Sequence, residues 1–484
     1  MRRGSIAALA HGARRVRGVR FGARALGVLA LAGLALACSH RQVDSGKGTR
    51  TEKNGWIAIH LEGTPHEIGR QHGTLLAPEI DDALKMIAHF LAGSTKEPWS
   101  FYREAAERMF WPRLDREYQE EIEGIVEGLH NRGMSYDRAD ITALNGWMEL
   151  ALYYVPALAA KTKADSLANR APGNCSGFVA TGSYTADGRI VMAHNSWVDY
   201  VVGERWNIIA DIVPEHGHRI FMDSYPGFIH SGDDFAENDA GILITETTIT
   251  QFRGFDENGV PEFNRARKAE QYAESIDQFD SIMTAGNNGG YANTWLVGDL
   301  KTNEIGKLDL GLRHTHLWRT HDGVFVGSNF ATDTALLAEE TTFNTADSTS
   351  SPLAREKRWS QLMDQYRGKL DASSAMAIEA DHGDVTTGTV TENRCVLCGH
   401  IDKDGRGAPW WDEGPYYPMG TVQGKVTTAA LAREMKFWAH MGHPCGEDFV
   451  AASFLAAHPE YRWQEPYLRD MKSYPWTLFA AEGR

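Results

Sequence analysis

The chain has 484 residues, of which 42% are hydrophobic and 10% aromatic, and its formal net charge is −15. A chain of this length and composition can bury a large core in one or two domains, which excludes a disordered or fibrous protein. Its acidic charge repels phosphate backbones, so the composition also argues against nucleic-acid binding.

The first residues have the composition of an export signal. Seven arginines and no acidic residue stand before Ala25. They are followed by an apolar run, Ala25 to Ala37, which is too short to span a membrane as a mature helix. We expect residues 1–37 to be removed, which moves the net charge from −15 to −22. The small residues before Cys38 resemble a bacterial lipoprotein cleavage box. Lipidation of Cys38 and ordinary secretion both stay open, so the predicted location is the bacterial periplasm, the cell surface or the medium.

The next segments are predicted to be a tether followed by a helical region. Residues 38–54 are polar and rich in Gly, Ser, Lys and Thr, which is typical of a flexible tether. We expect the folded N-terminal region to occupy residues 55–174. Alternating apolar residues predict a strand over residues 57–61, and the turn that follows leads into a helix that continues through Ile87. Residues 99–154 have apolar side chains at helical spacing, which predicts further packed helices.

A cysteine stands at the head of a predicted hairpin. Residues 161–173 are polar and punctuated by Ala, Pro and Gly, which predicts an exposed connector leading to Cys175. Apolar runs at residues 178–180 and 190–193 flank the turn signal Asp187-Gly188. The chain is therefore expected to pass from a loop into a strand at Cys175.

This position gives Cys175 a chemical meaning. A free cysteine is most often a small buried hydrophobic residue. If the bond between Asn174 and Cys175 is cut, however, Cys175 carries a thiol and a free α-amine, which is a nucleophile with its own base. This is the N-terminal nucleophile (Ntn) arrangement. No Gly-x-Ser-x-Gly motif occurs in the sequence, which argues against an ordinary serine esterase.

The remaining chain mixes strands and helices. Runs dense in β-branched or aromatic residues predict strands over residues 206–213, 219–223, 241–249, 295–298 and 323–326. Amphipathic spacing predicts helices over residues 265–282, 354–366, 373–380 and 427–440. Strands and helices that come in blocks favour a layered α+β fold.

The cysteines that follow the export signal allow more than one interpretation. They are Cys175, Cys395, Cys398 and Cys445. An exported protein can oxidise such residues to disulfides. The Cys395-x-x-Cys398 pair could instead contribute to a zinc site, which needs four ligands, and the companions that the sequence offers are Cys445, His400 and His443. A disulfide between Cys398 and Cys445 also stays open.

Several motifs occur in the same order as in one group of known proteins. They are Cys175-Ser176-Gly177-Phe178-Val179, Asp187-Gly188, His194-Asn195-Ser196-Trp197, Glu246-Thr247-Thr248-Ile249, Tyr291-Ala292-Asn293-Thr294-Trp295 and Gly424-Lys425-Val426-Thr427. On these residues the chain resembles phospholipase B-like proteins and the self-processing acyltransferases typified by isopenicillin N acyltransferase. Residues 63–73 are similar to the opening motif of the acyltransferases. The matches run from Trp56 to Phe449.

The resemblance implies a fold and a processing step. The implied fold is a four-layer αββα sandwich of Ntn-hydrolase type with an added N-terminal helical region. Self-cleavage between Asn174 and Cys175 would give a first chain that includes residues 55–174 and a catalytic chain of residues 175–484. We expect no cofactor and no metal.

The resemblance also implies roles for particular residues. It makes Cys175 the nucleophile, with His194 beside the thiol and Asn293 as the donor to the oxyanion. The implied substrate pocket contains Asn195, Trp197, Thr247 and a positive residue, for which Arg319 and Arg313 are the candidates. A structural disulfide between Cys395 and Cys398 is implied as well. The plainer interpretation of His194 is a hydrogen-bonded core histidine, and that of Asn293 is a turn residue.

The favoured function is therefore a self-processing hydrolase that cleaves an acyl amide or ester of a small acylated substrate through an acyl-enzyme. One alternative is an acyltransferase, in which an amine replaces water. Another is a non-catalytic surface lipoprotein on the same scaffold, and a third is a thiol or zinc protein built on the Cys-x-x-Cys pair. A phospholipid, an N-acyl amino acid, a peptide and a lactam all stay open as substrates.

Overall fold

The computed structural model describes residues 46–162, 175–232, 235–409 and 413–483. These described residues all belong to one unit. The predicted export signal over residues 1–37, the lipidation site Cys38 and the cleavage-site residue Asn174 all lie outside the described residues. They stay predictions.

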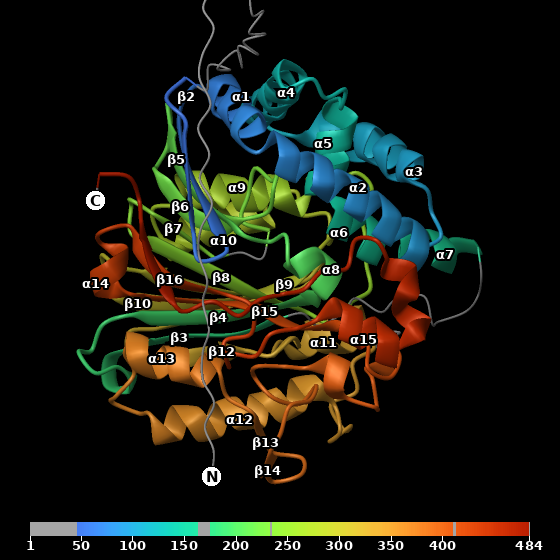
Figure 1. Ribbon diagram of the computed structural model, residues 1–484. Coiled ribbons are helices and arrows are strands. Elements are labelled where there is room, and N and C mark those ends of the chain that lie inside the picture. The colour runs from blue at the N-terminus through green and yellow to red at the C-terminus, as the bar shows by residue number, and fades with distance from the viewer. Residues whose placement is uncertain (1–45, 163–174, 233–234, 410–412, 484) are drawn as a thin grey trace, which may run out of the picture. The chain divides into compact units, whose positions relative to one another are not determined.

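A nine-stranded sheet forms the larger of two sheets (Figure 1). In spatial order its strands are β1 (Thr49–Lys53), β2 (Trp56–Gly63), β5 (Ile208–Pro214), β6 (Ile220–Ser224), β7 (Ala236–Asn238), β8 (Ile242–Thr248), β9 (Asn293–Asp299), β10 (Glu304–Leu310) and β11 (Thr315–Thr320). Strands β2 and β5 pair in parallel, whereas the other neighbours are antiparallel.

A six-stranded antiparallel sheet carries Cys175. In spatial order its strands are β12 (Gly323–Gly327), β3 (Cys175–Thr181), β4 (Val191–Asp199), β15 (Met419–Thr428), β16 (Lys436–Met441) and β17 (Thr477–Ala480). A short hairpin consists of β13 (Gly383–Asp384) and β14 (Thr389–Val390). Two sheets combined with many helices confirm the predicted α+β class.

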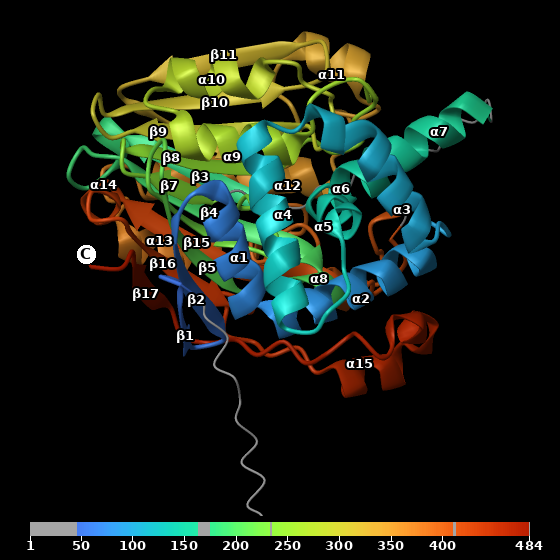
Figure 2. The ribbon, with the colours of Figure 1, turned by 90° about the horizontal axis from the view of Figure 1, so that it is seen from above.

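The helices fall into an N-terminal group and a later group (Figure 2). The first consists of α1 (Pro65–Leu75), α2 (Ala77–Ser94), α3 (Trp99–Ala105), α4 (Arg116–Asn131), α5 (Arg138–Asn145), α6 (Trp147–Glu149) and α7 (Val155–Thr162), with π-helical turns over Ala106–Phe110 and Leu150–Tyr154. The second consists of α8 (Tyr200–Gly203), α9 (Glu262–Tyr272), α10 (Ile276–Thr284), α11 (Thr334–Glu340), α12 (Ser351–Gln365), α13 (Ala372–Glu379), α14 (Ala429–Ala432) and α15 (Ala451–Ala457).

Three large hydrophobic clusters hold these elements together, and a fourth, smaller one includes Trp197. One joins the nine-stranded sheet to the N-terminal helices and to α9 and α10, and it includes Trp295. A second contains residues of both sheets, among them Val179 of β3 and Leu296 of β9. A third joins the six-stranded sheet to α12 and α13, where Phe178 packs edge-on against Trp359. Neighbouring residues of β3 thus enter different clusters, as the alternation of side chains along a strand requires.

The ordered chain begins earlier than the sequence predicts. Residues 49–53 were assigned to a tether that runs to residue 54, but they form β1 and pair with β2. The loop between the two strands is Asn54-Gly55, and both residues have positive φ, 49° and 82°. A two-residue turn of this kind matches the twist of a hairpin, and Asn-Gly is its strongest sequence signal. The turn chemistry therefore outweighs the polar composition.

Three predicted helices differ from the structure. The helix predicted to continue through Ile87 is two helices, α1 and α2, which are separated at Leu76. The helix predicted over residues 265–282 is two helices, α9 and α10, because Ser275 caps the second one by accepting a hydrogen bond from the Gln278 amide. The prediction of a helix over residues 427–440 is wrong. That segment contains the end of β15, the single turn α14 and most of β16, separated by Met435 with a φ of 52°. In β16, Phe437, Ala439 and Met441 enter one hydrophobic cluster and Trp438 packs against another, which is the two-sided arrangement of a strand.

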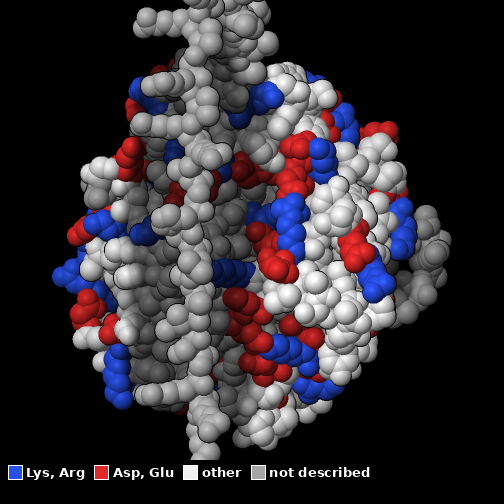
Figure 3. All heavy atoms as spheres, viewed as in Figure 1, with Lys and Arg blue, Asp and Glu red and all other residues white. Residues whose placement is uncertain are grey.

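The surface of the described part of the chain carries charges of both signs. On the face shown in Figure 3, acidic and basic side chains are interspersed. Among the described residues, no helix combines the length and the apolar character that crossing a membrane requires.

Glycines let helices α1 and α4 approach each other closely. A Cβ on Gly69 would lie 1.8 Å from the Glu121 carbonyl oxygen, and one on Gly73 would lie 2.2 Å from the Ile125 carbonyl oxygen. The contact is reciprocal, because a Cβ on Gly124 of α4 would lie 2.2 Å from a carbonyl oxygen of α1. These atoms belong to backbones, which cannot move aside as a flexible side chain can. The motif over residues 63–73 therefore encodes a helix contact.

We expect Gly69→Ala to lower the free energy of unfolding by about 2 kcal/mol or more, because the added methyl group forces two helix backbones apart. Helix propensity alone predicts the opposite sign, a gain of about 1 kcal/mol. Chemical denaturation of both proteins measures the difference. The matched control is Glu127→Ala on the exposed face of α4, which should change stability by no more than about 0.5 kcal/mol. An equally stable Gly69→Ala protein would contradict the close contact.

Candidate active site

Cys175 is the first residue of an interior strand. Strand β3 lies between β12 and β4, and Cys175 pairs with Ser196 of β4. Further along, Phe178 pairs with Ala193, so the predicted hairpin is confirmed. The side chain of Cys175 is only 2% exposed. Any chemistry at this thiol therefore takes place in a desolvated site.

Both the nitrogen and the sulfur of Cys175 have buried polar partners. The thiol donates to Glu246 Oε1 of β8 at 3.7 Å. The amide N–H donates to Asn329 Oδ1 at 3.2 Å. His194 completes the group, because ligand-type atoms of Cys175, His194 and Glu246 all lie within 4.8 Å of one another. These three side chains could bind a metal ion, and they also place an imidazole and a carboxylate beside the thiol.

Arg355 of α12 is a buried cation against the backbone of Cys175. Its Nη1 donates to the Cys175 carbonyl at 2.5 Å and to Ser176 Oγ at 2.8 Å. Its Nη2 donates to Asn329 Oδ1 at 2.7 Å, and the guanidinium carbon lies 4.5 Å from the ring centroid of Trp197. Burial lowers the pKa of Arg355 to about 10, so the side chain stays protonated at neutral pH.

A chain of buried polar groups continues behind His194. The Ser196 hydroxyl lies 3.4 Å from His194 Nδ1. Lys425 of β15 donates to the Ser196 hydroxyl at 2.5 Å and pairs with Asp223 of β6 at 3.0 Å. Because an ammonium group can only donate, the Ser196 hydroxyl accepts from Lys425. Its proton and its second lone pair allow the hydroxyl either to donate to His194 Nδ1 or to accept from it.

Asn195 and Trp197 serve a different purpose from His194. The Asn195 amide donates to the carbonyls of Glu379 and Leu397, at 2.7 Å and 3.2 Å. The Trp197 indole N–H donates to the same Leu397 carbonyl at 3.1 Å. These two residues therefore bind β4 to the segment after α13, and Trp197 reaches the site through its ring contact with Arg355.

Asn293 begins β9 and pairs with Thr248 of β8. Its side chain is fully buried, and neither atom of its carboxamide has a hydrogen-bond partner among the described residues. Tyr291, two residues earlier, donates to Glu246 Oε1 at 3.4 Å, and the same oxygen accepts from Cys175. The turn that leads into Asn293 thus contacts the carboxylate beside the thiol.

Thr247 and the two candidate arginines lie in different surroundings. Thr247 is buried in β8, where a Cβ on Gly327 of β12 would lie 2.4 Å from its hydroxyl. Arg319 is not brought to the site: it lies in β11 and pairs with Glu304 at 2.6 Å. Arg313 pairs with Glu340 at 3.1 Å and is largely exposed. The positive residue that contacts Cys175 is Arg355.

The expected disulfide is not present in the structure. None of the described cysteines, which are Cys175, Cys395, Cys398 and Cys445, forms a disulfide. The Cys395 thiol points to the Thr349 carbonyl at 3.9 Å, whereas the Cys398 thiol lies 3.8 Å from His400 Nε2. The two sulfur atoms of the Cys-x-x-Cys segment therefore have different neighbours.

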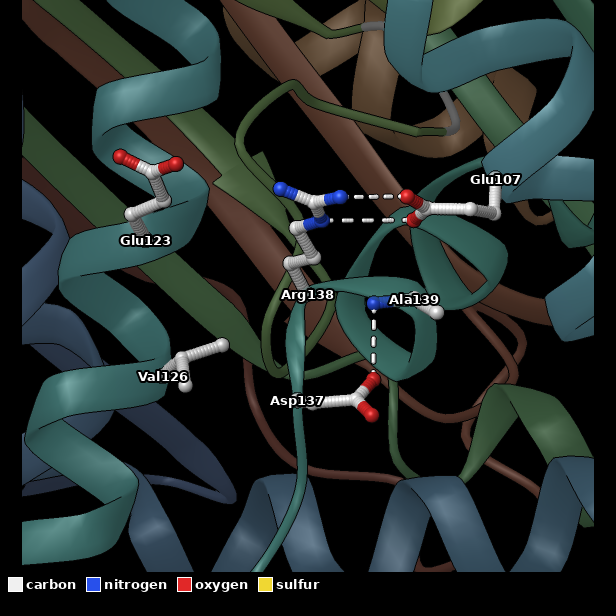
Figure 4. Close-up of a pocket in the computed structure, with 6 residues that line it drawn as sticks. All are labelled: Glu107, Glu123, Val126, Asp137, Arg138 and Ala139. Carbon is white, nitrogen blue, oxygen red and sulfur yellow. Dashed lines mark hydrogen bonds and ion pairs between the residues drawn. The ribbon is translucent and has the colours of Figure 1, made fainter.

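A pocket of about 480 Å³ lies among the N-terminal helices (Figure 4). Its lining residues are Glu107, Glu123, Val126, Asp137, Arg138 and Ala139, and none of them is a predicted site residue. Arg138 pairs with Glu107, and Asp137 accepts a hydrogen bond from the Ala139 amide. Asp137 and Glu123 pair with Arg103 and Arg116 outside the lining, so each charge already has a partner and the pocket offers little to orient a charged ligand.

Only some of the residues that contact Cys175 or the neighbours of His194 lie in recognisable sequence motifs. Glu246 and Lys425 stand inside motifs that carry the family resemblance, although no role was assigned to either. Asn329 and Arg355 belong to no recognised motif. The positive φ of Asn329, 71°, marks an unusual backbone position after β12, but a sequence does not reveal it.

Comparison with known proteins identifies relatives over much of the chain. The sequence model of the family described as Phospholipase B matches residues 79–374, which is more than half of the chain. An uncharacterized protein of Archaeoglobus fulgidus is 28% identical over 265 residues, which cover 52% of this chain and 43% of that protein. Phospholipase B-like 1 of Homo sapiens is 26% identical over 286 residues, with 54% and 50% covered.

Putative phospholipase B-like 2 of Caenorhabditis elegans is 25% identical over 211 residues, which cover 41% of this chain and 35% of that protein. The chain spans about half the length of the curated relatives it matches. The matched range includes β3, β4, β8 and β9, which carry Cys175, His194, Glu246 and Asn293. The resemblance noted in the sequence is confirmed, and the chain belongs to the phospholipase B-like family.

Proposed function

We propose that this protein is a self-processing Ntn hydrolase that cleaves an acyl amide or ester bond with Cys175 as the nucleophile. The observation that carries the proposal is the environment of Cys175. Its nitrogen contacts Asn329 and its sulfur contacts Glu246, so both groups that an N-terminal nucleophile uses already face fixed polar partners. Family membership is consistent with a hydrolase, since the named relatives are phospholipase B-like proteins.

Maturation begins with attack of the Cys175 thiolate on the carbonyl carbon of Asn174. The peptide C–N bond breaks, a thioester forms, and the Cys175 nitrogen takes up a proton to become an α-amine. Water then hydrolyses the thioester, which returns the thiol and leaves a carboxylate on Asn174. Arg355 fixes the Cys175 carbonyl during these steps, so the thiol turns about a backbone that is held in place.

Turnover uses the same thiol with the new amine as its base. The α-amine accepts the thiol proton, the thiolate attacks the substrate carbonyl, and the protonated amine gives its proton to the leaving amine or alcohol. Water, deprotonated by the α-amine, then hydrolyses the acyl-enzyme to a carboxylic acid. The buried carboxamide of Asn293 donates to the substrate oxygen as negative charge develops on it.

His194 and Glu246 act as neighbours of the thiol in this scheme. The Ser196 hydroxyl accepts from Lys425 and contacts His194 Nδ1, which holds the imidazole ring beside the thiol. Glu246 accepts from the thiol before the reaction. The pair thus orients the sulfur without acting as the base that the α-amine provides. Asn195 and Trp197 position β4, and Thr247 belongs to the wall of the site.

The proposal includes an αββα sandwich of Ntn type as the finer architecture. The hydrophobic cluster with residues of both sheets supports face-to-face packing of the sheets. The two other clusters support a helical layer on each outer face, since one contains α9 and α10 and the other α12 and α13. The region 55–174 adds the further helices.

We also propose that the protein is exported and acts on a small acylated substrate outside the cytoplasm. The arginine-rich, apolar start of the sequence supports export, and the small residues before Cys38 support an anchor through a lipid on that residue. The acidic charge disfavours nucleic acid as a partner.

The purified wild-type protein should split into two chains between Asn174 and Cys175, and Cys175→Ala should stay a single chain because it has no sulfur to receive the acyl group. Intact-mass measurement locates the cut to one residue. Cys395→Ala is the matched control, since it removes a buried thiol that does not begin a strand, and it should split normally. Two chains in Cys175→Ala would show that another protease makes the cut.

Asn293→Ala should mature normally but turn over a chromogenic acyl amide about 100- to 1,000-fold more slowly, which is the usual cost of one lost oxyanion donor. The loss should appear in kcat, because the interaction forms mainly in the transition state. Chain splitting on a gel and acyl release by absorbance measure the two steps separately. Near-normal turnover in a variant that has split would move the oxyanion donor elsewhere.

Arg355→Lys should slow both maturation and turnover by about 10-fold or more. A lysine cannot reproduce the fork that contacts the Cys175 carbonyl and Asn329 together. Arg358→Lys, in the same helix and paired with Asp381 at 2.6 Å near the surface, is the matched control and should leave both rates within about twofold. Unchanged rates in a folded Arg355→Lys protein would contradict the proposed role.

A further inference from the structure

A second cluster of ligand-type side chains lies outside the site around Cys175. Its members are His382, Cys398, His400 and Cys445, and their four ligand atoms all lie within 4.8 Å of one another. Cys398 and His400 are buried, while His382 and Cys445 are partly buried. We propose that this cluster, called the Cys2His2 cluster below, is a structural zinc site with two thiolate and two imidazole ligands.

The distances within the cluster fit one tetrahedral ion. Zinc binds cysteine sulfur at about 2.3 Å and histidine nitrogen at about 2.0 to 2.1 Å, so a tetrahedral site has S···N edges of about 3.6 Å. His400 Nε2 lies 3.8 Å from Cys398 Sγ and 3.6 Å from Cys445 Sγ. The three atoms are thus already spaced as corners around a common centre.

The donor set selects the class of metal. Two sulfur and two nitrogen donors suit Zn²⁺, whereas Ca²⁺ and Mg²⁺ require oxygen ligands, and no carboxylate belongs to the cluster. Four protein ligands complete a tetrahedral shell, which is typical of a structural site. Binding forms two Zn–S and two Zn–N bonds, and it releases the two thiol protons to solvent.

The ligands come from segments that the surrounding backbone fixes. The Cys398 amide donates to the Asp381 carbonyl at 3.1 Å, which ties the segments of Cys398 and His382 together. His400 forms an isolated bridge with Gly420 at the start of β15. Cys445 follows β16, far along the chain. A metal ion would therefore join the loop between α13 and β15 to the loop after β16.

His400 also has the outer contacts of a metal ligand. Its Nδ1 lies 3.7 Å from Asp402 Oδ1, and Tyr200 donates to the same carboxylate oxygen at 2.6 Å. At 3.7 Å this is an ion-pair contact and not a hydrogen bond, and the negative charge favours a proton on Nδ1, which is the tautomer that leaves Nε2 to bind a metal. His443 lies beside His400, with ring centroids 4.3 Å apart and the rings tilted by 40°, but it is not part of the four-residue cluster.

The cluster also connects to the strand that carries His194. The residue before Cys398 is Leu397, whose carbonyl accepts from both Asn195 and Trp197 of β4. Zinc bound at Cys398 would hold that carbonyl in place. We therefore expect loss of the metal to lower the thermal stability of the protein and to weaken the hydrogen bonds that Asn195 and Trp197 of β4 form with the Leu397 carbonyl. This inference does not depend on the proposed hydrolase activity.

The test measures zinc in the full-length protein, purified from the exported fraction without a metal-affinity tag. We expect one zinc ion per protein molecule, measured by elemental mass spectrometry of the wild type. Cys398→Ser and Cys445→Ser should each lower the zinc content to about a tenth or less. Exchange of zinc for Co²⁺ in the wild type should give the visible absorption bands of a tetrahedral cobalt–thiolate centre, and both variants should lack them.

Two matched controls place the ion. Cys395→Ser removes the other cysteine of the Cys-x-x-Cys pair and should retain zinc, because Cys395 does not belong to the cluster. Cys175→Ala should also retain zinc, which separates this site from the ligand-type group of Cys175, His194 and Glu246. If Cys398→Ser does not fold, His382→Asn serves in its place, since His382 is partly exposed, and it should also lose zinc.

Three results would overturn the proposal. One is a disulfide between Cys398 and Cys445, found by peptide mapping of the wild type. Another is a wild-type protein with all thiols reduced that neither contains zinc nor gains thermal stability when zinc is added. The last is zinc that Cys175→Ala loses and Cys398→Ser keeps, which would assign the ion to the site around Cys175.

Discussion

One buried guanidinium sets the geometry around Cys175. Arg355 is removed from water. Among the described residues it donates to the Cys175 carbonyl, to the side-chain oxygens of Ser176 and Asn329 and to the Ser351 hydroxyl, and none of these acceptors is a carboxylate. Neutral acceptors satisfy its donors, and the face of Trp197 covers the cation. A buried charge tolerates little displacement, because each lost contact exposes an uncompensated donor. Arg355 therefore fixes the start of β3 relative to α12.

Alternation along β4 lets one strand serve two purposes. His194 and Ser196 belong to the polar group that includes the thiol and the Lys425–Asp223 pair. Asn195 and Trp197 bind the Leu397 carbonyl, next to the Cys2His2 cluster. Because side chains alternate along a strand, those beside the Cys175 thiol and those next to the proposed metal site extend from opposite faces of β4. A shift of register by one residue would exchange the two sets, which explains why both sides of β4 are so heavily hydrogen-bonded.

Local patterns predicted the elements that depend on near neighbours. The hairpin headed by Cys175, the amphipathic helix α4 and the α+β class follow from turn signals and periodicity. The apolar residues of the segment 427–440 have a spacing that also fits a helix. Only the pairing of its two ends with β4 and β17 shows that they are strands. Contacts across the chain were beyond this kind of inference: Asn329 and Arg355 stand 154 and 180 residues from Cys175, and neither belongs to a motif. The same holds for His382, which no spacing rule connects with Cys445.

The partners of the Cys175 nitrogen also bear on the base that the proposed mechanism needs. An α-amine has an ordinary pKa of about 7.7 to 8.0, so in water near neutral pH it is mostly protonated and cannot accept the thiol proton. Asn329 Oδ1 accepts from both the Cys175 nitrogen and Arg355, which places the guanidinium charge close to the amine that cleavage would create. A nearby positive charge and burial both disfavour the ammonium form. Arg355 would thus favour a neutral amine, ready to act as a base, in addition to fixing the carbonyl on the other side of the same residue.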